Sequence, residues 1–170
     1  MAVDMEQVRA ALMPEEPDYP EAAKLGPEAL PHLEKIVTED HAGLAAKAAY
    51  LAGVIGTDKS LGTLQKAARN ADPVVRVAAA AAARHLPDEY SDALVLQLVD
   101  DVDAGVQKVA LRSAPTEMSD ALKARVDAYA SAASAAAAKP AKAARKPAAK
   151  KSAAKKPTGK KSAARKRASR

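Results

Sequence analysis

The sequence predicts an all-α protein in which a short array of helix pairs is followed by a disordered basic tail. Ala dominates the composition, Phe and Trp are absent, and the chain has only four Tyr residues. A core of small aliphatic side chains suits closely packed helices better than sheets. Apolar residues also recur at helical spacing. Finally, every acidic residue lies before residue 128, so the chain divides sharply in charge.

The first helix is predicted from Asp4 to Met13. Asp4 followed three residues later by Gln7 has the spacing of a capping box, in which each residue satisfies the other's free backbone N–H. Pro14 then ends the helix, and we expect residues 17–20 to form a loop because Pro occupies both ends of this stretch.

A pair of helices is predicted next. Pro27 suits the first turn of one helix, and His41 to Ile55 forms the second, with Gly56 as its stop. Each helix has an apolar stripe that we expect to be buried. The stripes are Leu30, Leu33, Ile36 and Val37 in the first helix, and Leu44, Ala48, Leu51, Ala52 and Ile55 in the second.

The same pattern returns after 31 residues, and again after a further 31, without an insertion. Small apolar residues fall on small apolar residues: Leu30, Leu33, Ile36 and Val37 on Leu61, Leu64, Ala67 and Ala68; Leu44, Ala48, Ala49 and Ile55 on Val75, Ala79, Ala80 and Leu86; Leu64 and Ala67 on Val95 and Leu98; Val75, Ala79 and Ala83 on Val106, Ala110 and Ala114. A fixed period of helix pairs predicts an α-solenoid of about three pairs. Segments 4–13 and 117–129 would cap its two ends.

Residues 25–115 resemble HEAT repeats of the bacterial type. The resemblance rests on Leu25–Leu33 (LGPEALPHL), on Gly53–Gly56 (GVIG) and on Asp72–Ala80 (DPVVRVAAA). It implies a HEAT-like solenoid but not one function, because such folds serve as scaffolds, enzyme subunits and nucleic-acid binders.

Many HEAT arrays stack an Asp and an Arg at matching positions of successive second helices. This chain has Asp72 and Asp103, but Ala45 and Gln107 stand where Arg76 would recur. We therefore expect no continuous polar ladder, with Arg76 either solvated or paired with a local carboxylate.

Charge divides the chain into an acidic body and a basic tail. Residues 1–127 contain 13 basic and 21 acidic residues, whereas residues 128–170 contain 14 basic residues and no acid. The net charges are therefore −8 and +14, and we place the domain boundary at residue 130. A segment of like charges interrupted by Pro, without large apolar residues, cannot offset its ordering entropy. We expect residues 131–170 to be disordered, with the alternative that Ala130 to Ala138 extends the last helix because Ala has the highest helix propensity.

The tail resembles the Lys/Ala/Pro-rich arms of linker histones and of some bacterial histone-like proteins. Mobile cations gain free energy by releasing counterions from phosphates, without reading bases. We therefore predict that the tail binds DNA, and that the protein is cytoplasmic and associated with the nucleoid. The predicted phosphate contacts are Lys139, Lys142, Arg145, Lys146, Lys150, Lys151, Lys155, Lys156, Lys160, Lys161, Arg165, Lys166, Arg167 and Arg170.

Other interpretations remain open from the sequence. The body is expected to bind a protein partner, so the chain could be a scaffold whose tail binds RNA, an acidic protein or an anionic membrane. A membrane is the weaker alternative because the tail has no Trp, Phe or Leu to insert. A further hypothesis is that the acidic body attracts the tail and competes with DNA at low salt.

Enzymatic function is not expected. The chain has no Cys, no Gly-x-Ser-x-Gly and no phosphate-binding Gly-rich loop, and its start lacks the apolar stretch of a signal peptide. His32, His41 and His85 do not have metal-ligand spacing, so we expect helix-end or surface roles and no cofactor. The carboxylate clusters at 15–18, 88–89 and 100–103 are expected to be helix caps and solvated faces.

Overall fold

The computed structural model describes residues 3–137, with side chains described as far as residue 132. Over this range every regular element is a helix and there is no strand, which confirms the predicted all-α class. Within the same range, none of the helices is both long enough and apolar enough to cross a membrane.

The first helix, α1 (Met5–Leu12), begins as predicted. The Gln7 backbone N–H donates to Asp4 Oδ1 at 2.8 Å, and the Asp4 backbone N–H donates to Gln7 Oε1 at 3.2 Å. This reciprocal pair is the predicted capping box, with Val8 and Leu12 buried on the inner face of the helix.

The prediction of a loop over residues 17–20 was wrong in its second half. A short helix, α2 (Tyr19–Ala22), begins there, and a 3₁₀ turn, η1 (Ala23–Leu25), continues it. Asp18 caps α2 by accepting from the Glu21 backbone N–H at 3.0 Å. Pro20 is tolerated because the first turn of a helix has no intrahelical use for its backbone N–H.

Three helix pairs follow, as the 31-residue period predicts. In each pair a first helix is joined by a short turn to a second helix that begins at a side-chain cap: His41, Asp72 and Asp103 accept hydrogen bonds from the backbone of the turn that they open. The elements are η2 (Pro27–Ala29), α3 (Leu30–Val37) and α4 (Ala42–Ile55); α5 (Ser60–Ala68), α6 (Pro73–Ala82) and η3 (Ala83–His85); α7 (Asp88–Leu98) and α8 (Ala104–Arg112).

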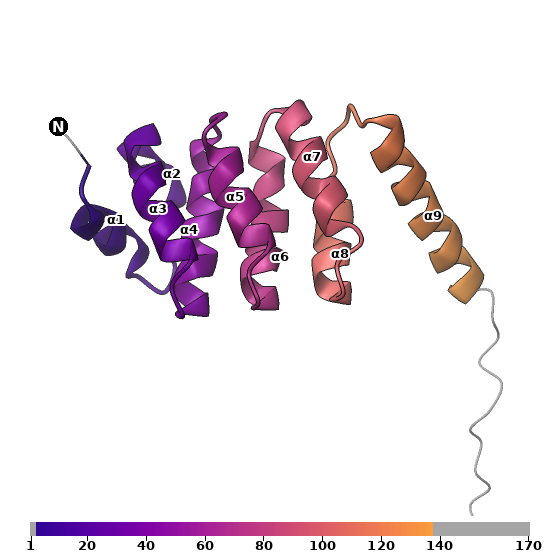
Figure 1. Cartoon of the computed structure of the whole chain (residues 1–170), viewed down its shortest axis with the longest axis horizontal. Coiled ribbons are helices and arrows are strands. Elements are labelled where there is room, and N and C mark those ends of the chain that lie inside the picture. The colour runs from indigo at the N-terminus through magenta and orange to yellow at the C-terminus, as the bar shows by residue number, and fades with distance from the viewer. Residues whose placement is uncertain (1–2, 138–170) are drawn as a thin grey trace, which may run out of the picture. The chain divides into compact units, whose positions relative to one another are not determined.

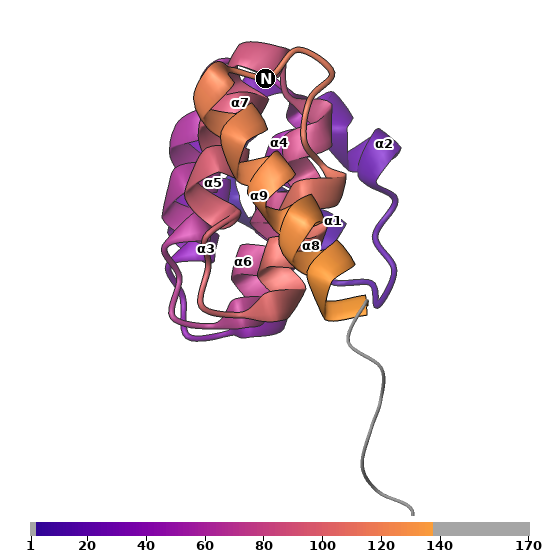
Figure 2. The same cartoon turned by 90° about the vertical axis from the view of Figure 1, so that its right-hand side faces the viewer.

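The pairs are arranged in two layers. Helices α3, α5 and α7 lie side by side in one layer, and α4, α6 and α8 lie side by side in the other (Figure 1). Each first helix also packs on the second helix of its own pair. At the start of the row, α1 and α2 pack against the first pair. At the other end, α9 (Asp120–Ala137) lies across the row in contact with α7 (Figure 2).

The core lies between these layers and includes most of the side chains that the periodicity singled out. The fully or almost fully buried positions include Leu30, Leu33, Ile36, Val37, Leu64, Ala67, Ala68, Val75, Ala79, Ala80, Val95, Leu98, Val106 and Ala110. Leu44, Ile55, Leu61 and Ala114 pack at its edge and are only partly buried.

Small residues let the second helices approach closely. A Cβ atom built on Gly53 of α4 would lie 2.5 Å from Ala82 Cβ and 2.8 Å from Ala82 O. Gly56 ends α4 in the left-handed conformation, with φ of 65°, as expected of the predicted stop.

The last helix extends past the predicted domain boundary. Helix α9 continues to Ala137, so residues 131–137 are helical rather than part of a disordered tail. A run of Ala has the highest helix propensity and needs no burial to continue a helix already begun. The rest of the predicted tail, residues 138–170, lies outside the described residues.

Candidate functional site

The predicted phosphate contacts, Lys139 to Arg170, all lie outside the described residues. The described residues therefore show the body that precedes these contacts in the chain, and not the contacts themselves. Helix α9 is the element that leads to them along the chain.

Fewer than half of the basic residues of the body are paired with its own carboxylates. Of the 13 basic residues in 1–127, six form ion pairs: Arg9–Glu39, Lys24–Glu21, Lys66–Glu34, Arg76–Asp101, Lys123–Asp120 and Arg125–Asp100. Lys47 instead donates to the carbonyl oxygens of Leu12 at 3.4 Å and Pro14 at 2.6 Å. The net charge of −8 of the body therefore opposes binding of a polyanion, whichever of its cations are paired.

Arg76 is neither solvated nor paired only within its own helix pair, contrary to our expectation. Its Nε donates to Asp101 Oδ2 at 2.8 Å and its Nη2 donates to Asp101 Oδ1 at 3.0 Å. Asp101 stands in the turn before α8, so the contact joins the second helix pair to the third. The side chains are only 11% and 9% exposed. The guanidinium holds the pKa of Asp101 below its ordinary value, mainly through these hydrogen bonds.

A polar contact between a second helix and the turn before it recurs with the 31-residue period, although the residue types change. Arg76 Nη1 donates to the Asn70 carbonyl at 2.9 Å, and one period later Gln107 Nε2 donates to the Asp101 carbonyl at 2.6 Å. These two contacts stay within one helix pair. Asn70 Nδ2 also donates to the Val37 carbonyl at 3.0 Å, which joins the second pair to the first, as the Arg76–Asp101 contact joins the second to the third.

The histidines hold helices and segments together. His41 caps α4, with its Nδ1 accepting from the Leu44 backbone N–H at 3.1 Å. His85 Nε2 lies 3.1 Å from the Tyr50 hydroxyl, at the end of η3. These two confirm the predicted helix-end roles.

His32 also lies at a helix end, in the first turn of α3. It is partly buried, and its Nε2 lies 3.0 Å from the Val3 carbonyl oxygen. Throughout the described side chains, no three His, Asp or Glu residues are grouped so that they could hold a metal ion.

The carboxylate clusters divide into caps and ion pairs. Asp18 and Asp103 cap α2 and α8, and Asp88 and Glu89 lie in the first turn of α7, as predicted. Asp100 and Asp101, expected to be solvated, bind Arg125 and Arg76 instead. Both arginines lie outside the cluster in sequence, so short-range patterns could not identify them.

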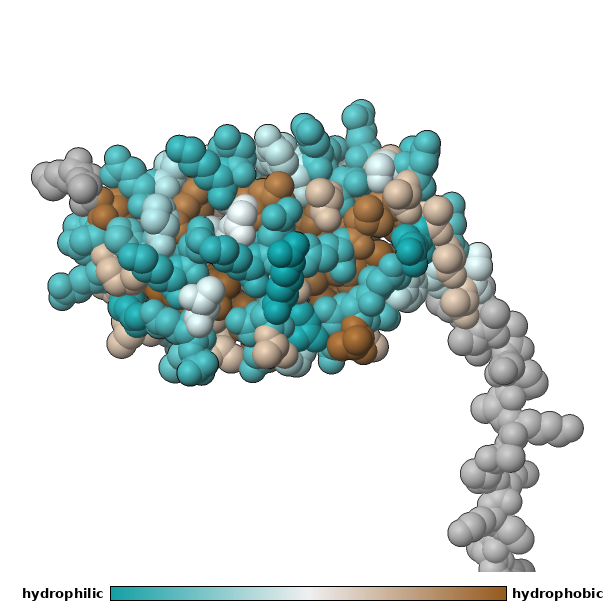
Figure 3. Space-filling model, in the orientation of Figure 1, coloured by the Kyte–Doolittle hydropathy of each residue, from teal (hydrophilic) through white to brown (hydrophobic). Residues whose placement is uncertain are grey.

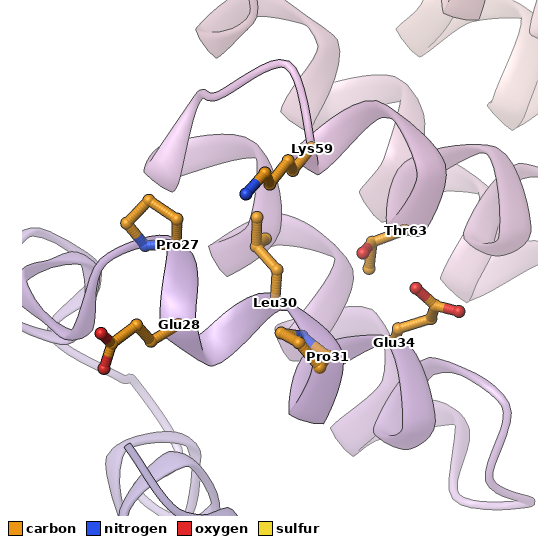
Figure 4. A pocket seen from close by; sticks show the side chains of 7 residues that line it. All are labelled: Pro27, Glu28, Leu30, Pro31, Glu34, Lys59 and Thr63. Carbon is orange, nitrogen blue, oxygen red and sulfur yellow. The ribbon is translucent and has the colours of Figure 1, made fainter. Parts of the chain in front are cut away.

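A cavity of about 380 Å³ opens between η2, α3 and α5 (Figure 4). Pro27, Leu30 and Pro31 line it, and Glu28 and Glu34 lie on opposite sides of Leu30 (Figure 4). Glu34 is already paired with Lys66. Lys59 and Thr63 complete the lining, so the cavity combines apolar side chains with charged and hydroxyl groups.

Three large apolar side chains are exposed on the body: Met13 (73%), Val74 (56%) and Val102 (98%). Val74 lies in the first turn of α6, and Val102 lies in the turn before α8. The face of the molecule seen in Figure 3 is otherwise mostly hydrophilic, with separate apolar patches. Single exposed apolar residues are common on protein surfaces, so these three side chains do not by themselves mark a contact site.

The sequence matches no protein-family model, and it is not significantly similar to any curated protein.

Proposed function

We propose that this protein is a non-enzymatic, nucleoid-associated DNA-binding protein whose basic tail binds phosphates with little sequence preference. The observation that carries the proposal is the segregation of charge: 14 basic residues and no acid in 128–170, beside a body of net charge −8. Each tail cation can neutralise a phosphate and release a condensed counterion, which requires no fixed geometry.

In this proposal the body is a HEAT-like α-solenoid that contributes shape and a protein-binding surface. The 31-residue period, the two layers of helices and the polar contacts between successive helix pairs, Asn70–Val37 and Arg76–Asp101, support this assignment. An array of repeats buries its apolar faces between neighbours and leaves extended surfaces for partners.

The ion pairs of the body support the proposal that the tail, rather than the body, binds DNA. Six body cations are already engaged by carboxylates, so an approaching phosphate would have to displace those partners. The tail has no carboxylate of its own to compete with DNA. Affinity for DNA should therefore depend on the tail.

The experiment is a salt titration of duplex DNA binding by the full chain and by a variant with six tail lysines changed to Gln: Lys150, Lys151, Lys155, Lys156, Lys160 and Lys161. If all six contact phosphates, the slope of log K against log salt should become shallower by about 5. The matched control changes Lys35, Lys59 and Arg69 of the body to Gln and should leave the slope unchanged. An unchanged slope in the tail variant would refute the proposal.

A second candidate function is a protein-interaction scaffold whose tail binds RNA, an acidic protein or an anionic membrane. The extended surface of a row of helix pairs favours a protein partner for the body. The two candidates differ in what accompanies the protein from cells. The DNA-binding proposal expects co-purifying DNA that high salt removes, whereas the scaffold expects a protein that remains bound in high salt through apolar contacts.

A further inference from the structure

A small polar pocket lies where the end of α6, the start of α7 and the end of α8 meet. Its volume is about 190 Å³, and its lining includes Arg84, Asp88, Ser91, Arg112, Ser113 and Thr116. Arg84 comes from η3, Asp88 and Ser91 come from α7, and Arg112 and Ser113 end α8. Two helix pairs therefore contribute to it.

Its two arginines are free of carboxylate partners within the described part of the chain. The Arg112 guanidinium has no hydrogen bond or ion pair there, and the Arg84 guanidinium donates only from Nε, to the Ala81 carbonyl at 3.0 Å. Both side chains are exposed. The charge of Arg84 is strong enough locally to help lower the pKa of His85, although burial is the larger cause.

Two buried hydroxyls in the same lining have no partner among the described residues. Ser91 and Ser113 are 2% and 3% exposed, and neither Oγ makes a hydrogen bond. A buried hydroxyl without a partner costs free energy. Each could reach an acceptor in the pocket by rotating about its Cα–Cβ bond, because a serine hydroxyl is a donor with staggered rotamers.

Helix-end stabilisation accounts for only part of this arrangement. Arginine is favoured in the last turn of a helix, which suits both Arg84 and Arg112. That preference does not explain why two unpartnered hydroxyls share their pocket. A bound group that accepts hydrogen bonds and carries negative charge would satisfy all four residues.

We propose that this pocket binds a phosphate-type oxyanion through Arg84, Arg112, Ser91 and Ser113. Two guanidinium groups supply charge-assisted hydrogen bonds, and the hydroxyls supply neutral donors. Asp88 is the one carboxylate in the lining, and its Oδ2 accepts from the Glu117 backbone N–H at 3.4 Å. One carboxylate against two arginines leaves the lining positive. The site is independent of DNA binding by the tail.

The test uses ¹⁵N-labelled full-length protein titrated with inorganic phosphate at constant ionic strength, followed through the backbone amides of Ser91, Ser113 and Thr116. These body amides report the pocket separately from phosphate bound by the tail. We expect saturable chemical-shift changes. The affinity for phosphate obtained from them should fall about tenfold in the double variant Arg84→Gln/Arg112→Gln and about threefold in Ser113→Ala. Arg69→Gln is the control, since Arg69 is an exposed cation at the end of α5.

Asp88→Asn tests whether the negative charge of Asp88 opposes phosphate binding. The amide keeps an oxygen for the Glu117 N–H but removes the negative charge, so phosphate should bind more tightly. A merely structural role for Asp88 would not increase affinity. Circular dichroism would confirm that each variant is folded.

Duplex DNA in a parallel titration distinguishes the sources of phosphate. Shifts of the same amides with DNA identify backbone phosphates, whereas shifts with inorganic phosphate alone identify a free phosphate or monoester; both support the site. Phosphate shifts that do not saturate, or that are equally strong in the double arginine variant, would overturn it.

Discussion

Arg76 binds Asp101 through a bidentate contact that joins the second helix pair to the third. Nε and Nη2 of the guanidinium donate to the two carboxylate oxygens. The same guanidinium also donates through Nη1 to the carbonyls of Asn70 and Ala71, both at 2.9 Å. Asp101 Oδ1 accepts in addition from the Asp103 backbone N–H at 2.8 Å. One pair of side chains thus fixes two successive turns of the array.

Removing the charge of Asp101 should destabilise the body. We expect Asp101→Asn to lower the free energy of unfolding by about 2–3 kcal/mol, because a little-exposed guanidinium loses its charged acceptor. Urea unfolding followed by circular dichroism measures this. Asp100→Asn is a matched control: its ion pair with Arg125 is about half exposed and should contribute less than about 1 kcal/mol. Equal losses in the two variants would contradict the assignment.

The Asp101 carboxyl should also affect how steeply the stability of the protein falls at acidic pH. Its pKa in the folded protein lies below the ordinary value of 3.8, so the unfolded chain takes up the proton first. Stability from this group is complete above about pH 4 and is lost as the pH falls through the lowered pKa. Unfolding midpoints from about pH 5 to pH 2 should therefore fall less steeply in Asp101→Asn than in the original protein. Parallel profiles would rule this out.

His85 predicts a second pH dependence, at higher pH. Burial, and secondarily the charge of Arg84, hold its pKa below 6.5. The unfolded chain therefore binds the proton more readily, and stability declines as the pH falls below about 6.5. Thermal unfolding between about pH 7.5 and pH 5 should show a smaller decline in His85→Gln than in the original protein. The prediction fails if the two profiles have the same slope across this range.

Gly53 should be intolerant of a side chain. Gly53→Ala places a methyl group against Ala82 and forces α4 and α6 apart, at a cost of about 1–3 kcal/mol. Gly62→Ala is the control, because Gly62 lies within α5 and nothing lies within 4 Å of its added Cβ. That substitution should stabilise by about 0.5–1 kcal/mol through helix propensity. Chemical unfolding of both variants would show opposite signs.

Local patterns predicted much of this fold. The capping box of Asp4 and Gln7, the stop at Gly56 and the buried stripes at 31-residue spacing all follow from interactions within one or two helical turns. The short helix α2 was missed because Pro20 was interpreted as a helix breaker, although it stands where a helix accepts Pro. The last residues of α9 follow Ala propensity rather than an apolar stripe, which corresponds to the predicted alternative and not to the domain boundary at residue 130.

Residue order alone was enough to establish helix pairs, their caps, and the separation of an acidic body from a basic segment, since these depend on neighbours along the chain and on composition. Tertiary packing determined which distant side chains contact each other. Asp101 meets Arg76 from 25 positions earlier, and Arg84 meets Arg112 and two serines in one pocket, because stacked repeats bring distant turns together. No local periodicity encodes such contacts, which depend on how closely Ala- and Gly-lined helices approach each other.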